Sequence, residues 1–355
     1  MKKSNTEGRK SGVTKRDQVY VGLDVHKRSI YAAIRVNGVE VKTHSMPAEP
    51  VMVVKLLEKY RPGLKKVVYE AGPTGYGLAR RLLKEGFPAE VIAPGKMLKA
   101  AQEGAKSDRL DCRKLAEYAQ KDLLKAVTIP TEEQEGHRQL MRLRNSVIEK
   151  RKRVKQQIKS FLLQHGVQEP SGLEYWNLSA LFELKELKLS GALRYTLDSY
   201  IRELLFWADE LKKVNSQLKE LVKSEGYEEK ARLLRSHPGV GEVTTVQMLT
   251  EVYQPERFNN PKQVTAYVGL APMVRQSGES RKEGPLAKGG RGTLRAALVE
   301  SAWTWIRLEK KAAKAYAKLV KNTGSANKAI VAMARKLLVH LWVMLVRREA
   351  YRPMA

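Results

Sequence analysis

Four acidic residues stand where their carboxylates could act together on bound metal. Asp24 follows the apolar run VYVGL, Glu70 follows a second run, LKKVVY, and Asp108 and Asp111 are three residues apart in KSDRLDCRKLA. A carboxylate at a buried strand end costs free energy unless it is paired or holds a cation. Four such groups close together would repel one another unless cations lie between them. Mg²⁺ takes oxygen ligands and substrate phosphates, and two ions about 4 Å apart would support phosphodiester chemistry.

Each acid taken alone has an ordinary structural explanation. Asp24 could simply begin a turn after its strand. Asp108 and Asp111 would share one face of the first turn of a helix, where acidic residues favour the helix dipole. The dipole does not explain why two strands elsewhere also end in carboxylates. The set of four therefore predicts a site for Mg²⁺ or Mn²⁺.

The elements that would carry these acids follow from the apolar pattern. Asn37-Gly38 between two β-forming runs predicts a two-residue hairpin. The expected order β-β-β-α-β-α-β-α is that of a ribonuclease-H-like domain, with Asp24 and Glu70 at the ends of two different strands. The strands are expected at residues 18–24, 29–36, 40–43, 64–69 and 89–92, and the helices at 52–60, 78–85 and 108–120.

Two long amphipathic helices are expected next. Apolar residues recur at three- and four-residue spacing from Glu132 to about His165, flanked by many Lys and Arg, and again from Ala192 to about Glu225. A polar break with Gly166 and Pro170 separates them. The pair is predicted to form an antiparallel helical hairpin or coiled-coil arm. The arm could serve dimerisation, nucleic-acid binding or spacing, and the sequence does not choose among them.

The C-terminal part is expected to be mostly helical. The motif HPGVG at 237–241 is typical of a helix-hairpin-helix, in which Gly239 and Gly241 allow close backbone approach and the next helix offers N–H groups to a phosphate. An ordinary helix-helix turn is the alternative. Residues 258–295, rich in Gly, Ser and cations, are expected to form a loop that exposes a hydroxyl beside phosphate-binding groups. Helices are expected at 302–321 and 326–346.

Composition narrows the class of partner. The chain has 355 residues, with 66 Lys and Arg against 38 Asp and Glu, so its formal charge is +28. A charge of that size is best neutralised by a polyanion such as DNA or RNA. A membrane partner is disfavoured, because the apolar run Leu337–Val346 contains His340 and is too short to span. The one cysteine, Cys112, excludes a disulfide framework and fits a reducing cytoplasm.

Several motifs in a fixed order resemble the DEDD transposases, a family that includes Piv-type DNA invertases and bridge-RNA-guided recombinases of insertion sequences. The resemblance covers nearly the whole chain. It is carried by GLDVHK (22–27), YEAGPTGYGLAR (69–80), KSDRLDCRKLA (106–116), HPGVG (237–241), AYVGLAPMVRQSG (266–278) and KGGRGTLR (288–295). Family members are expected to have Thr and Ala where this chain has Ser107 and Cys112, and both replacements are conservative.

The resemblance implies a RuvC-like nuclease domain with Asp24, Glu70, Asp108 and Asp111 as its acidic tetrad. It implies a C-terminal transposase domain in which Ser277 is the nucleophile that joins covalently to DNA, although spacing alone leaves Ser280 open. It also implies a structured bridge RNA that pairs with target and donor DNA. Members act as dimers that assemble into tetramers, with the acidic domain of one subunit near the serine of another.

The sequence thus predicts a DNA transposase or recombinase of a bacterial or archaeal insertion sequence, located in the cytoplasm at the nucleoid. The alternatives are a metal-dependent, junction-resolving endonuclease and a non-catalytic nucleic-acid scaffold. The domains are expected at 1–16 (disordered basic arm), 17–128 (RuvC-like), 129–230 (helical arm) and 231–355 (transposase domain with the serine loop). The residues expected to contact nucleic acid are Arg275, Arg281, Lys288, Arg291, Arg295, Gly239 and Gly241.

Overall fold

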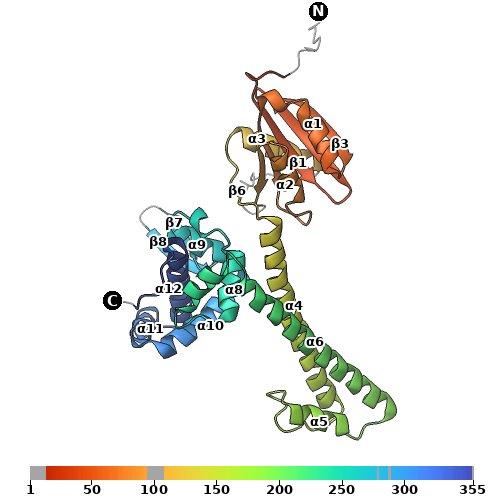
Figure 1. Cartoon of the computed structure of the whole chain (residues 1–355), viewed down its shortest axis with the longest axis vertical. Helices are drawn as coiled ribbons and strands as arrows, with labels where there is room; N and C mark the ends of the chain where they lie inside the picture. Colours follow the sequence, from red (N-terminus) through yellow and green to blue (C-terminus); the bar gives the residue numbers. More distant parts are fainter. Residues whose placement is uncertain (1–12, 94–107, 278–279, 287–288, 354–355) are drawn as a thin grey trace, which may run out of the picture. The chain divides into compact units, whose positions relative to one another are not determined.

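The computed structural model describes residues 13–93, 108–277, 280–286 and 289–353 (Figure 1). The chain divides into two compact units, Met1–Thr131 and Glu132–Ala355. The first is an α/β unit built on a mixed sheet, and the second is helical apart from one β-hairpin. The coarse prediction of an α/β part followed by helices is therefore confirmed. The finer division into three domains and a basic arm stays a prediction.

The sheet of the first unit runs in the order β3-β2-β1-β4-β5-β6. Strand β1 pairs antiparallel with β2 and parallel with β4, and β4 pairs parallel with β5. The parallel pairs bring the carboxyl ends of β1 and β4 to the same edge of the sheet. The strands are β1 (Val19–Val25), β2 (Ser29–Val36), β3 (Val39–Pro47), β4 (Leu64–Glu70), β5 (Ala89–Ile92) and β6 (Ala126–Val127).

Helices cover both faces of this sheet. Helices α1 (Pro50–Glu58) and α2 (Gly77–Lys84) share one core with the inward residues of β1, β2 and β4. Helix α3 (Asp108–Gln120) packs on the opposite face, where Leu115 and Ala119 join a second core. The short 3₁₀ turn Arg61–Gly63 leads into β4.

The predicted elements of this unit are confirmed with small shifts. The hairpin turn Asn37-Gly38 has positive φ at both residues, 49° and 87°, as a two-residue hairpin requires. Strand β3 extends four residues beyond the predicted 40–43, because it pairs along the whole length of β2 from Val36 to Ser29. Helix α3 begins at Asp108 and ends at Gln120, as predicted.

Two long helices, α4 (Glu132–Gln164) and α6 (Gly191–Lys223), pack against each other in the second unit (Figure 1). Their far ends enclose a core with α5 (Leu178–Glu186), a helix that the sequence did not predict. The side chain of Asn177 accepts a hydrogen bond from the Ala180 amide (2.8 Å) and caps α5. Short helices with a capped start inside a polar segment give a weak periodic signal, so this one was missed.

The rest of the second unit is a helical bundle with one hairpin. It comprises α7 (Glu228–Arg235), α8 (Glu242–Glu251), the 3₁₀ turn Pro255–Arg257, α9 (Pro261–Val268), β7 (Pro272–Ser277), β8 (Ser280–Leu286), α10 (Gly292–Leu308), α11 (Lys310–Thr323) and α12 (Ala326–Arg347). The prediction of one helix over 302–321 was wrong. The chain breaks at Glu309, whose carboxylate accepts hydrogen bonds from Trp305 Nε1 (2.9 Å) and the Tyr351 hydroxyl (2.7 Å).

Among the residues that the structure describes, one helix, α12, has the length and apolarity of a membrane-spanning segment. Many of its apolar side chains, including Met333, Leu337 and Leu341, are fully buried in the core of the bundle. A helix buried on its apolar face has its hydrophobic partner within the protein. The composition of α12 is therefore explained by its place at the centre of this unit.

Candidate active site

Asp24 and Glu70 lie beside each other at one edge of the sheet. In the parallel pairing of β1 with β4, Leu23 is opposite Tyr69, and the two acids are the next residues of their strands. Both side chains are half-buried. The sheet thus brings together two carboxylates that are 46 positions apart in the sequence.

Side-chain alternation sets the face on which these acids lie. Leu23 and Tyr69 point into the core under α1 and α2, whereas Val68 packs with Leu115 on the α3 face. Successive side chains of a strand point to opposite faces of the sheet. Asp24 directly follows Leu23 and Glu70 directly follows Tyr69, so the side chains of both acids leave the strands on the α3 face. Any metal that they hold would therefore lie between the sheet edge and α3.

Gly22 lets α3 approach this edge closely. A Cβ at Gly22 would stand 2.1 Å from the Cys112 carbonyl oxygen and 2.5 Å from the Ala116 nitrogen, so only glycine fits. Cys112 is buried, and burial followed by the negative charge of Asp24 raises the pKa of its thiol to about 11. The first turn of α3 therefore lies near Asp24.

That first turn carries the other two predicted acids. Asp111 immediately precedes Cys112 and is exposed, and Asp108 is the first residue of α3, with its side chain outside the described set. The backbone thus brings all four predicted acids to one corner of the first unit. Their role as catalytic and metal-binding residues stays a prediction.

The donors of this corner fit a hard divalent cation. Carboxylate oxygens on neighbouring strands are the ligands that Mg²⁺ and Mn²⁺ prefer. Among the residues whose side chains are described, no three His, Cys, Asp or Glu gather closely enough to hold a metal, and Asp108 is not among them. One neighbour of Asp24 was not predicted from the sequence: His26 Nε2 lies 3.0 Å from Asp24 Oδ2. Its position two residues after Asp24 in GLDVHK was the available signal.

The predicted nucleophile lies at the end of a strand, not in the open loop that was expected. Strands β7 and β8 pair antiparallel, and Ser277 is opposite Ser280 in the last pair before the hairpin tip. The two candidate serines therefore pair with each other across the hairpin. Arg275 is opposite Lys282, and Arg281 is opposite Gln276, in the same ribbon. The side chains of residues 274–283 are outside the described set, and Lys288 falls wholly outside it.

Two glycines close the base of this hairpin. Gly269 and Gly290 have φ values of 84° and 101°, and a Cβ on Gly290 would stand 2.6 Å from the Gly269 nitrogen. The amide of Arg291 donates to the Val268 carbonyl (3.1 Å). The chain thus enters and leaves the hairpin through one tight contact that no larger residue would allow.

A buried ion-pair cluster holds that base in place. Glu251 Oε2 lies 3.1 Å from Arg291 Nε and 3.5 Å from Arg138 Nε, and both Glu251 and Arg138 are almost fully buried. Arg291 also donates to the Tyr267 hydroxyl, and Arg295 Nη1 donates to the Gly269 carbonyl (3.2 Å). Arg291 and Arg295 therefore have partners within the protein. Their predicted contact with nucleic acid stays a prediction.

The two glycines of HPGVG have different surroundings. A Cβ at Gly239 would stand 2.6 Å from the Ser301 carbonyl oxygen, so this glycine serves packing of the turn against α10. Gly241, just before α8, has open space around it. The first residue of α8 is Glu242, and an acid there satisfies the positive helix end that a phosphate would otherwise use. Phosphate binding at this turn stays a prediction.

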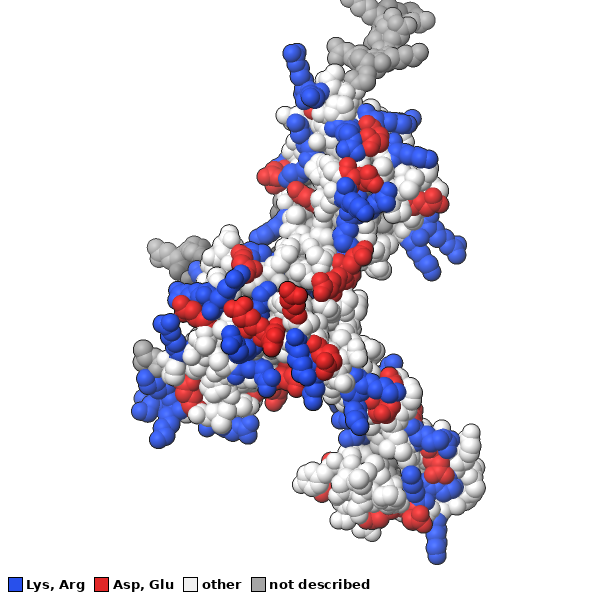
Figure 2. All heavy atoms as spheres, viewed as in Figure 1, with Lys and Arg blue, Asp and Glu red and all other residues white. Residues whose placement is uncertain are grey.

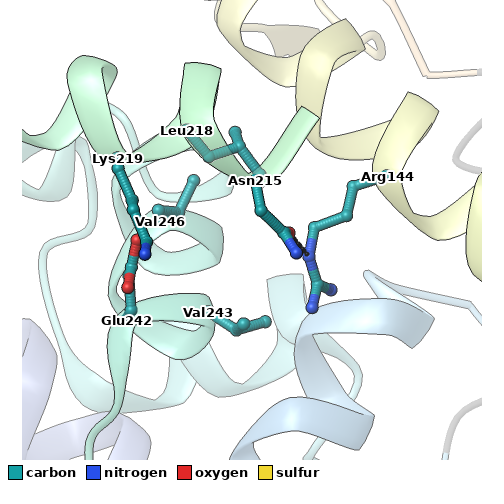
Figure 3. A pocket seen from close by; sticks show the side chains of 7 residues that line it. All are labelled: Arg144, Asn215, Leu218, Lys219, Glu242, Val243 and Val246. Atoms are coloured by element: carbon teal, nitrogen blue, oxygen red, sulfur yellow. Dashed lines mark hydrogen bonds between the residues drawn. The ribbon is translucent and has the colours of Figure 1, made fainter. Parts of the chain in front are cut away.

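A small cavity of about 160 Å³ lies beside Glu242, where α4, α6 and α8 meet (Figure 3). Arg144 from α4 donates to the Asn215 side chain of α6 (2.8 Å), and Lys219 points toward Glu242. Burial lowers the pKa of Arg144, while the charge of Glu242 opposes that shift. The cavity therefore lies between the two long helices of the arm, α4 and α6, and helix α8 of the bundle.

Lys and Arg are spread over the visible surface of both units, with Asp and Glu between them (Figure 2). The formal charge of +28 is therefore not confined to one segment. Such a surface attracts nucleic acid over many phosphates.

Two family models of transposases match segments of the chain. A family model described as a transposase, of the DEDD type of IS110 elements, matches residues 21–167. A second, described as the transposase IS116/IS110/IS902 family, matches residues 231–318. The first match contains the acidic corner with Asp24, Glu70, Asp108 and Asp111. The second contains the β7–β8 hairpin that carries Ser277, called the serine hairpin below.

Relatives extend the match beyond these segments. A protein of Sinorhizobium fredii named as transposase y4qE is 30% identical over 299 residues, which cover 81% of this chain and 72% of the relative. The transposase for insertion sequence element IS1533 of Leptospira borgpetersenii is 29% identical over 81% of this chain and 85% of its own length. The pilin gene-inverting protein of Moraxella bovis is 29% identical over 44% of this chain and 49% of its own.

The family models and these relatives define an enzyme that rearranges DNA, a transposase or recombinase. The chain belongs to the IS116/IS110/IS902 family of insertion-sequence transposases. The DEDD domain of this family implies a divalent metal and a DNA substrate.

Proposed function

We propose that this transposase cuts and rejoins DNA through a serine nucleophile, Ser277, with the acidic tetrad Asp24, Glu70, Asp108 and Asp111 holding Mg²⁺ or Mn²⁺. The observation that carries the proposal is the pairing of Leu23 with Tyr69, which puts Asp24 and Glu70 side by side next to the first turn of α3. The six-stranded order and the two parallel pairs support a RuvC-like, ribonuclease-H-like assignment for this unit.

The chemistry proposed for Ser277 conserves phosphodiester energy. Its hydroxyl oxygen forms a bond to the scissile phosphorus, the phosphorus–oxygen bond to the leaving DNA strand breaks, and the serine proton ends on the released DNA hydroxyl. Attack by a different DNA hydroxyl on the phosphoserine reverses the exchange, so no ATP is needed. A bound divalent cation would supply positive charge that lowers the pKa of the attacking alcohol or stabilises the leaving oxygen. The protein's part is to hold Ser277 at the end of a hairpin with a fixed base.

Arginines and lysines of the serine hairpin would hold the scissile phosphate. Arg275 and Arg281 lie in the two strands, and Lys288 follows β8. Guanidinium groups bind phosphate oxygens through paired hydrogen bonds, so they suit this role. Arg291 and Arg295 would act from the hairpin base, where they already hold protein groups.

The proposed partners are target and donor DNA, a structured bridge RNA and further copies of the chain. The family resemblance carries the RNA guide and the assembly of dimers into tetramers, and the high positive charge supports binding of two nucleic acids at once. If the acids of one subunit serve the serine of another, a mixture of Asp24→Ala and Ser277→Ala chains recovers activity that neither has alone.

The second candidate is a metal-dependent, structure-specific endonuclease in which the hairpin only binds DNA. The acidic corner alone would suffice for it, and it predicts that the Ser277→Ala chain still cleaves a branched DNA substrate. The serine mechanism predicts no cleavage by Ser277→Ala and none by Asp24→Asn. Cleavage by purified Ser277→Ala, measured with Mg²⁺ on a branched DNA and, with the bridge RNA added, on DNA carrying the element ends, separates the two functions; Asp24→Asn is the inactive control for both.

A further inference from the structure

A pocket of about 460 Å³ opens on the other side of the strand end that carries Asp24. It is lined by Val25, His26, Lys27, Ile30, Ala48, Pro50, Pro73, Thr74 and Leu78. All of these residues belong to the first unit and are described by the structure. Its size lies in the range of small-molecule sites, which hold ligands in clefts of roughly 300–1,000 Å³.

The lining of the pocket is divided by chemistry. Val25, Ile30, Leu78 and two prolines provide apolar and flat surfaces, while His26, Lys27 and Thr74 provide polar groups. Bases that leave the stack are held between apolar or aromatic side chains and read by a few hydrogen bonds. A nucleotide has the matching division into a flat base and a charged phosphate.

Two helices begin at this pocket. Leu78 is the second residue of α2, which has no acid in its first turn and no side chain capping its end, whereas α1 starts with Pro50, which has no N–H, directly after the acid Glu49. Helix N-termini carry partial positive charge and attract phosphate. Together with Lys27, the start of α2 makes the pocket favourable for an anion.

His26 connects the pocket to the acidic edge. It lines the pocket, and its Nε2 lies 3.0 Å from Asp24 Oδ2. A DNA strand whose scissile phosphate lay at Asp24 and Glu70 would therefore bring its neighbouring nucleotide within reach of the pocket.

We propose that this pocket holds one unpaired nucleotide of the DNA strand being cut, next to the scissile phosphate. The inference rests on the proposed function, since it takes the acidic corner as the place of cleavage. It adds a binding subsite: the apolar walls receive the base, and Lys27 with the start of α2 receives the adjoining phosphate.

Photo-crosslinking tests the subsite. The full-length protein is irradiated with a single-stranded DNA that carries one 5-iodo-deoxyuridine, and crosslinked peptides are identified by mass spectrometry. Crosslinks are expected in residues 25–30 and 73–78. Ala48→Phe fills the pocket and should lower their yield at least tenfold, while Val51→Phe, exposed on α1 outside the pocket, should leave it unchanged. Both variants are first shown to melt at the parental temperature. If Ala48→Phe melts at a lower temperature, Thr74→Arg takes its place.

The outcomes separate this inference from the proposed function. Crosslinking needs no cleavage, so it should persist in Ser277→Ala, and it would stand even if that variant still recombined DNA. Absence of crosslinks in both segments, or an unchanged yield in folded Ala48→Phe, overturns the subsite while the serine mechanism can still hold. The same probe made as RNA should crosslink more weakly, and crosslinking of the RNA alone would contradict a DNA occupant.

Discussion

At the scale of single residues, His26 is the clearest addition to the predicted residues of the candidate active site. It contacts Asp24 through a hydrogen bond of 3.0 Å, and a partner that orients a metal-binding carboxylate commonly contributes 10–100-fold to activity or metal affinity. We expect His26→Gln to lower the rate of DNA cleavage by about 10-fold to 100-fold. His44→Gln, on β3, is the matched control and should cleave at the parental rate. A parental rate for His26→Gln would remove His26 from the site.

The sequence pointed to the four acids because strand ends and helix starts leave a visible pattern of residue types, and the family resemblance pointed to Ser277; the roles of all five stay predictions. The sequence could not indicate the role of Glu251, since the partners of Glu251 lie on other elements, and it passed over His26 although that residue stands two positions after Asp24. Glu251 is the last residue of α8, and nothing in the local pattern there indicates that Arg138, 113 positions earlier, lies 3.5 Å away. Arg291 and Arg295 looked like free cations in a basic loop for the same reason.

At the scale of elements, the contact of β1 with α3 decides whether the acidic corner forms. Gly22→Ala places a Cβ against the backbone of Cys112, so we expect it to destabilise the first unit by about 1–3 kcal/mol and to reduce cleavage. Gly77→Ala is the control, because a Cβ there meets nothing within 4 Å. Urea unfolding measures both free energies. Equal stability of Gly22→Ala and the parent would refute the close packing of α3.

The base of the serine hairpin gives a second prediction for an element. Glu251→Gln keeps the shape but leaves Arg138 and Arg291 without their shared carboxylate, and removing one partner of a buried pair costs about 3–5 kcal/mol. We expect lower stability of the second unit and faster proteolysis within residues 272–286. Glu256→Gln, an exposed acid nearby, should behave as the parent. Unchanged proteolysis in Glu251→Gln would show that the cluster does not hold the hairpin.

Regular elements were predicted well where period and turn chemistry agree, as in β2, α3 and α12. The hairpin β7–β8 was predicted as a loop, because its Gly-rich, cationic composition resembles a loop and its pairing is set by the contact between Gly269 and Gly290. The break between α10 and α11 was missed because the apolar pattern continues across it. Only the hydrogen bonds of Glu309 to Trp305 and Tyr351 show why the helix ends there.

At the scale of the whole molecule, stability should depend on pH through buried His237. Burial, and then the neighbouring His340, lower the pKa of His237 to about 3, against 6.5 in an unfolded chain. Tyr351, Trp305 and His340 pack around its ring, and Glu309 lies near His340. Between pH 6.5 and 3 the unfolded chain binds a proton that folded His237 does not. This residue's stabilisation is therefore complete above pH 6.5 and falls below it, by up to about 1.4 kcal/mol per pH unit.

Urea unfolding of the full chain at pH 7 and pH 5 measures this dependence. His237→Phe should flatten it, while His165→Gln, an exposed histidine on the arm, should keep the parental slope. A parental slope in His237→Phe would mean that other groups set the acid sensitivity.

The central claim, that Ser277 joins covalently to DNA, is tested most directly by trapping the adduct. The full-length protein is incubated with Mg²⁺, the bridge RNA and end-labelled target and donor DNA carrying the element ends, denatured in detergent and digested with protease. We expect a labelled adduct that survives denaturation, maps to Ser277 within β7 and is absent from Ser277→Ala. An adduct on Ser280 or elsewhere, or strand joining by Ser277→Ala at the parental rate, would contradict it.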